Sequence, residues 1–100
     1  MVELSLPRLV GSRAAAWQLL EPHLQHLENG SVVLNCRDLR SGSPSFADEV
    51  VKLVLADGGA HELVLVGASD DFARYVQESA AARSVQGRVA LLPAGAEIGA

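Results

Sequence analysis

The sequence has little cysteine, few aromatic residues and almost no lysine. Cys36 is the only cysteine, so one chain can form neither an internal disulfide nor a thiolate metal cluster, and a reducing cytoplasm is the expected location. Four aromatic residues (Phe, Trp and Tyr) among 100 leave an aliphatic core. The eight basic residues are scattered and the net charge is −4, so no positive stripe is available to neutralise a nucleic-acid backbone. We therefore expect no nucleic-acid partner.

Long hydrophobic runs are missing as well. No stretch approaches the roughly 18 uninterrupted apolar residues of a membrane span, so no membrane partner is expected. The first residues contain the acidic Glu3 and no basic start, which does not fit a signal peptide. About half of the residues are apolar, which suits one domain over residues 1–100. The excess of arginine and alanine over lysine is typical of a GC-rich bacterial genome.

Hydrophobic periodicity and turn residues divide the chain into alternating strands and helices. Strands are predicted at residues 2–6, 31–36, 61–66 and 88–92, and helices at residues 45–56, at residues 71–83 and from residue 14 to the stop at 29–30. The alternation predicts an α/β fold, a single small sandwich of about four mostly parallel strands covered by three helices. A frayed tail is expected from about residue 94.

The first helix carries one apolar stripe and one interruption. The stripe consists of Trp17, Leu20, Leu24 and Leu27, which are spaced three and four residues apart. Pro22 removes a backbone donor and clashes with the preceding turn, so we expect a kink or two short helices.

The segment SGSPSFADEV, residues 41–50, opens the helix predicted at 45–56. Either Ser43 or Ser45 can cap this helix. Ser45 and Asp48 have the spacing of a capping box, whereas Pro44 would suit the first turn if Ser43 were the cap. Since a helix N-terminus favours added negative charge, both serines are candidate phosphoacceptors.

The body of the same helix is predicted to be amphipathic. Phe46 belongs to its apolar face and is expected in the core. On another face, Asp48 and Lys52 are spaced for an i,i+4 ion pair.

Catalytic and metal-binding patterns are weak. Gly67 has neither the companion glycines nor the lysine of a phosphate-binding loop. His23 and His26 lack a placed third ligand, and Cys36 lies at the end of a buried strand with no histidine close in sequence, as a core thiol would. Because no nucleophile, base and charge stabiliser can be assembled, we expect no enzyme, no catalytic residue, no metal and no cofactor.

The run SVVLNCRDLRSGSPSFADEVVKLVL, residues 31–55, resembles the STAS-like domains of bacteria. This family of unknown function is related to the sulfate-transporter and anti-sigma-factor-antagonist STAS domains. Residues 45–49 match its Ser-Phe-Ala-Asp-Glu signature letter for letter, and Arg13 matches an arginine near the start of the family's first helix. The similarity covers about residues 10–80.

The resemblance implies a regulatory or signalling domain that binds a protein partner. In the wider STAS group, a partner kinase of the GHKL ATPase type phosphorylates a serine or threonine at this helix N-terminus, and phosphorylation breaks partner binding. We therefore expect binding to a protein, such as a GHKL-type ATPase or kinase, through the loop 40–45 and the helix 45–56. The expected contact residues are Arg40, Ser43, Ser45, Asp48 and Glu49.

Two alternatives stay open. One is a phosphorylation switch of the anti-sigma-factor-antagonist kind, with Ser45 or Ser43 as the acceptor. The other is a small-molecule or nucleotide binder that uses the loops 37–45 and 67–72, because functional groups gather at the carboxyl ends of strands in open α/β sheets.

Overall fold

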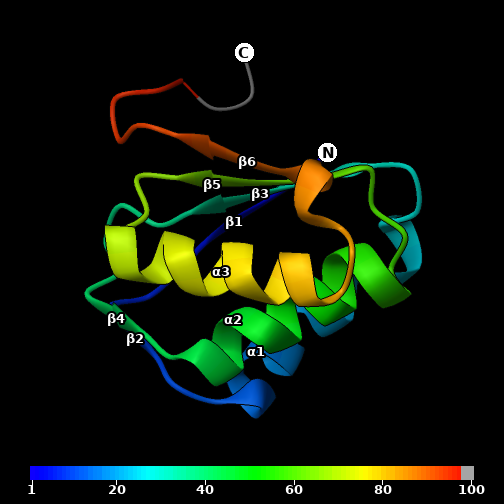
Figure 1. Ribbon diagram of the computed structural model, residues 1–100, viewed down its shortest axis with the longest axis horizontal. Helices are drawn as coiled ribbons and strands as arrows, with labels where there is room; N and C mark the ends of the chain where they lie inside the picture. Colours follow the sequence, from blue (N-terminus) through cyan, green and yellow to red (C-terminus); the bar gives the residue numbers. More distant parts are fainter. Residues whose placement is uncertain (98–100) are drawn as a thin grey trace.

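A four-stranded parallel sheet forms one layer of the structure, and helices pack against one of its faces (Figure 1). This computed structural model describes residues 1–97. The strands, in their order across the sheet, are β1 (Val2–Ser5), β3 (Ser31–Asn35), β5 (Glu62–Val66) and β6 (Val89–Leu92). The α-helices are α1 (Arg13–Leu20), α2 (Pro44–Val51) and α3 (Asp70–Ala82). The predicted α/β class is confirmed.

Each strand of this sheet pairs with the next one along the chain. β1 pairs with β3, β3 with β5, and β5 with β6, always in parallel. Crossovers between parallel strands are right-handed in nearly all proteins, and here each one moves across the sheet in the same direction. All three α-helices therefore lie on the same face, as Figure 1 shows. No helix within residues 1–97 is long and apolar enough to cross a bilayer.

A serine caps each of the three α-helices. Ser12 accepts a hydrogen bond from Ala15 N, and Ser69 caps α3 in the same way. At α2, Ser43 Oγ accepts from Phe46 N at 3.0 Å, and Pro44 is the first helical residue. The helix thus begins one residue earlier than predicted, with Ser43 as its cap, and the capping box of Ser45 and Asp48 is wrong.

The ends of two helices depart from simple α-geometry. After α1 the chain continues as a 3₁₀ helix, η1 (Glu21–His26), which confirms the break predicted at Pro22. α2 passes into a π-helix, η2 (Lys52–Asp57), which the sequence did not predict. The wider π turn rotates less per residue, and η2 buries three consecutive residues, 53–55. Trp17, expected on the buried stripe, is exposed on α1.

The core lies between the sheet and the helices. Its two largest side chains are Phe46 of α2 and Phe72 of α3, whose ring centroids are 6.1 Å apart. The prediction that Phe46 anchors its helix in the core is confirmed, because the side chain is fully buried. Gly42 lies against the Phe72 ring so closely that a Cβ at position 42 would be 2.6 Å from a ring carbon.

A smaller apolar cluster lies on the other face of the sheet. Val33, Val64 and Val66 form it, and Ala96 packs against them from the segment that follows β6. Arg37 donates hydrogen bonds to the carbonyls of Ala94 and Ala96 and holds this segment in place. Ala94 and Ala96 of the expected frayed tail are thus bonded to the domain, and residues 98–100 lie outside the described residues.

Candidate functional site

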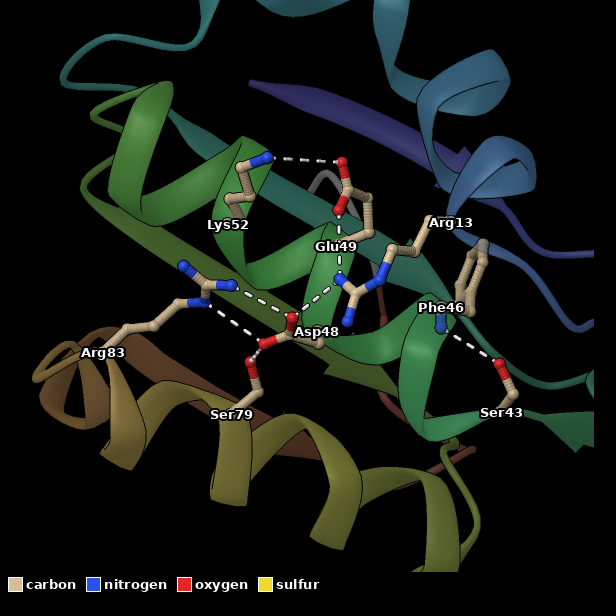
Figure 2. Close-up of polar contacts among 8 residues, drawn as sticks. All are labelled: Arg13, Ser43, Phe46, Asp48, Glu49, Lys52, Ser79 and Arg83. Carbon is tan, nitrogen blue, oxygen red and sulfur yellow. Dashed lines mark hydrogen bonds and ion pairs between the residues drawn. The ribbon is translucent and has the colours of Figure 1, made fainter.

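Asp48 of α2 lies between α1 and α3 and accepts hydrogen bonds from Arg13 of α1 and Ser79 of α3 (Figure 2). Arg13 Nη1 of α1 donates to its Oδ2 at 2.7 Å. From α3, Ser79 Oγ donates to Oδ1 at 2.6 Å. The guanidinium of Arg83, just beyond α3, adds Nε to Oδ1 at 3.2 Å and Nη2 to Oδ2 at 3.0 Å. One carboxylate therefore links all three helices.

These donors stabilise the ionised form of Asp48. Hydrogen bonds from Arg83, then from Ser79 and Arg13, hold the pKa of the Asp48 carboxyl well below its usual range. The hydrogen bonds to Asp48 and Glu49 raise the pKa of Arg13 in turn. Asp48 therefore stays ionised at neutral pH.

Glu49 extends the same network along α2 to Lys52. Its Oε1 accepts from Arg13 at 3.1 Å, and its Oε2 pairs with Lys52 Nζ at 3.8 Å. The predicted ion pair between Asp48 and Lys52 is wrong, because Asp48 turns toward Arg13 and Arg83 and leaves Lys52 to Glu49. Both acidic residues of the Ser-Phe-Ala-Asp-Glu segment thus hold the helices together.

A cleft of about 940 Å³ lies at the carboxyl ends of β1 and β3, where parallel α/β sheets commonly bind ligands. Three arginines and one acid give it a positive lining. It is formed by Leu6, Pro7, Arg8, Leu9, Arg37, Asp38 and Arg40. Leu9 is 70% exposed, the most exposed leucine described.

Two short strands fix the rim of this cleft. β2 (Leu9–Val10) and β4 (Ser41–Gly42) form a parallel pair. Arg40 N and Ser41 N both donate to Arg8 O, at 2.8 and 3.1 Å. The loop 40–45 therefore runs directly beside residues 8–10 and ends at the capped start of α2.

The five predicted contact residues differ in where they lie and in what their side chains contact. Arg40 lies at the cleft, and Ser45 is exposed in the first turn of α2. Ser43 uses its hydroxyl as the helix cap. Asp48 and Glu49 belong to the ion-pair network instead. The role of all five in binding a partner stays a prediction.

Sequence reasoning missed several residues of these two sites. Ser79 and Arg83 gave no local signal, since they become partners of Asp48 only through helix packing. Arg8 and Leu9 had a signal, because they follow a predicted strand whose carboxyl end meets that of residues 31–36 in a parallel sheet. They were not singled out.

The other reactive side chains do not gather into a centre. Cys36 is buried, and burial raises the pKa of its thiol to about 12. Within residues 1–97, no three side chains of His, Cys, Asp or Glu come together in a way that could hold a metal ion.

Comparison of the chain with models of protein families, with curated proteins and with solved structures gave no significant match in any of the three.

Proposed function

We propose that this chain is a small non-catalytic regulatory domain of the STAS-like type. It binds a protein partner through the loop 40–45, the adjoining residues 8–9 and the first turn of α2. The partner presents an acidic segment with an apolar side chain. A GHKL-type ATPase or kinase, the class implied by the sequence resemblance, is the first partner class to test.

The observation that carries this proposal is the exposed Leu9 among arginines. Leu9 is 70% exposed, and burying it against a partner would remove this apolar surface from water and stabilise the complex. Arg8 and Arg40 flank it in the same cleft, and no described side chain pairs with either guanidinium. Arginine is enriched where interfaces bind tightly, because its planar fork matches carboxylates.

Asp48 and Glu49 have an indirect part in this proposal. Their ion pairs with Arg13 set the position of α2, and with it the position of the first turn and of Ser45. Substituting them would disturb the helix layer as well as any contact with a partner. Substituting Arg40 tests the contact without disturbing the helix layer, because its side chain lies on the surface.

The test uses affinity capture followed by a binding measurement. Wild type, Arg40→Gln and the control Arg74→Gln, which removes an exposed arginine of α3, are used as bait in lysate of the source organism. A protein held by wild type and by the control is then purified. We expect Arg40→Gln to bind it about tenfold more weakly or worse. Equal affinity of Arg40→Gln and wild type, or no specific capture, would overturn the proposal.

A second candidate function is a phosphorylation switch at Ser45. The Ser45 hydroxyl is exposed and makes no hydrogen bond to a described residue, whereas the Ser43 hydroxyl is occupied as the cap. A phosphate at the second helical position would meet the positive end of the helix dipole. Mass spectrometry of the 41–52 peptide from cells tests this role, and an unmodified peptide under every growth condition would exclude it.

A further inference from the structure

The two edges of the main sheet differ in charge. β1 carries the exposed Glu3 within its four residues, and a charge on an edge strand discourages pairing with a further strand. β6 contains no charged residue, and its Leu91 and Leu92 are 44% and 41% exposed. β6 is therefore the edge to which another strand can add.

The backbone of β6 offers hydrogen-bonding groups at this edge. Leu92 O accepts a hydrogen bond from Gly67 N, so the backbone groups of Leu92 face β5. Because these groups alternate in direction along a strand, the N–H and C=O of Leu91 face outward. The neighbouring outward N–H, that of Val89, already bonds to Gln86 O. Among the residues of β6, Leu91 thus has both its backbone N–H and its backbone C=O open at the outer edge.

The flank of α3 beside β6 is small and uncharged except for Asp70 in the first turn. Ser79 faces α2, so at helical spacing the opposite flank carries Ala73, Gln77 and Ala81. Ala73 lines a small groove together with Leu91. A second helix can therefore approach α3 closely on this side.

We infer that two copies of this chain associate through β6 about a two-fold axis at Leu91. Their two sheets join into one eight-stranded sheet, in which the two central β6 strands are antiparallel. Each Leu91 N–H donates to the C=O of the other Leu91, which satisfies both outward groups. The same register sets Leu91 against its counterpart on the helix side. On the other face it sets Leu92 against Ala90, a large side chain against a small one.

The α3 helices complete this interface. In the two-fold arrangement they run antiparallel and pass each other near Ala73, which lines the same groove as Leu91. Asp70 at the start of one helix then lies beside Val76 and Gln77 of the other, which carry no charge. A strand edge alone falls short of the about 800 Å² per partner that stable interfaces bury, so the contact between the helices is required. Since the β1 edge is charged, head-to-tail addition is disfavoured and the assembly closes at two copies.

The first test is the mass of the protein in solution, by light scattering across a range of concentrations. Wild type is expected at twice the 10.5 kDa of the chain. Leu91→Lys, which puts a charge on the open edge, is expected at the mass of one chain. The control Leu9→Lys changes an exposed leucine away from β6 and is expected to stay dimeric. If circular dichroism shows that Leu91→Lys is unfolded, Ala73→Glu tests the same interface from α3.

The second test reads the register directly. Opposed residues of a hydrogen-bonded antiparallel pair have Cα atoms about 5.5 Å apart, which suits a disulfide. Leu91→Cys is therefore expected to cross-link two chains on mild oxidation much faster than Leu92→Cys, whose exposure is similar. Equal rates for the two variants, a wild type that stays at the mass of one chain, or a dimer unaffected by Leu91→Lys would each overturn the inference.

Discussion

Replacing Asp48 by asparagine is expected to weaken the packing of the three helices while it preserves the shape of the side chain. The substitution removes the negative charge that Arg13 and Arg83 share. The amide of asparagine can accept from Ser79, but it offers two guanidinium groups only one neutral oxygen.

The size of the effect follows from how far the site is buried. An exposed ion pair contributes about 0–1 kcal/mol, whereas removing one partner of a buried pair costs about 3–5 kcal/mol. The Asp48 side chain is 27% exposed and lies between these limits. We expect Asp48→Asn to lower the free energy of unfolding by about 2 kcal/mol. In a domain of this size, that lowers the melting temperature by about 8–16 °C.

The effect should depend on pH in one direction. The pKa of Asp48 is lowered in the folded state, so its contribution to stability is present above the unfolded pKa and is lost as pH falls toward the folded pKa. Wild type should therefore exceed Asp48→Asn in stability by the full amount at pH 7. The two proteins should converge as the pH falls below about 4.

Urea unfolding followed by circular dichroism at pH 7 and at about pH 3 measures this difference. Asp71→Asn is the matched control, because Asp71 is 73% exposed and pairs only with Arg74 of its own helix, at 3.3 Å, among the described side chains. It should cost less than about 0.5 kcal/mol. A loss for Asp48→Asn no larger than that of the control, or one that is equal at both pH values, would refute the reasoning.

Four further substitutions test the local structure, each by urea unfolding. Gly42→Ala forces a Cβ against the Phe72 ring and should destabilise by about 1–3 kcal/mol, and a neutral result would show that the ring moves freely. Ser43→Ala should lower the free energy of unfolding by about 1 kcal/mol because it removes a helix cap, whereas Ser45→Ala should lower it by under about 0.5 kcal/mol. A larger loss for Ser45→Ala would indicate that Ser45 is the cap. Cys36→Ser should lower the free energy of unfolding by about 1–3 kcal/mol because it places a hydroxyl in the core. A thiol reagent at neutral pH should label wild-type Cys36 only as urea unfolds the protein. Rapid labelling of the folded protein would contradict the burial of Cys36.

Much of the fold was predictable because its signals are local. The apolar, β-branched run from Ser31 and the run ending at Val66 form strands with bounds within one residue of the prediction. Pro22 marks its break by covalent geometry alone. The π-helix was not predictable in this way, because residues 52–57 also fit an α-helical pattern and the burial of three successive side chains is decided by the layer beneath them.

The site was predictable only where one segment contains all of its parts. Phe46 showed its role by periodicity, and Ser43 was one of two caps that the segment allowed. The role of Asp48 depends on Arg13 and Arg83, each 35 residues away, and helix packing decides which arginine reaches it. The i,i+4 spacing favours Lys52 as the partner of Asp48, so the local ion pair was predicted. The prediction is wrong because the two arginines reach Asp48 instead.

The pairing of each strand of the main sheet with its successor also fixes the order in which interacting parts of the domain are synthesised. Partner residues lie 26 to 31 positions apart at each step across the sheet, so each strand is synthesised after the strand on which it adds. The ion pairs of Asp48 follow the same sequence. Its contact with Arg13 can form once α2 exists, whereas Arg83 arrives only after α3 has been synthesised. The carboxylate therefore has all of its donors available only once α3 and Arg83 have been synthesised.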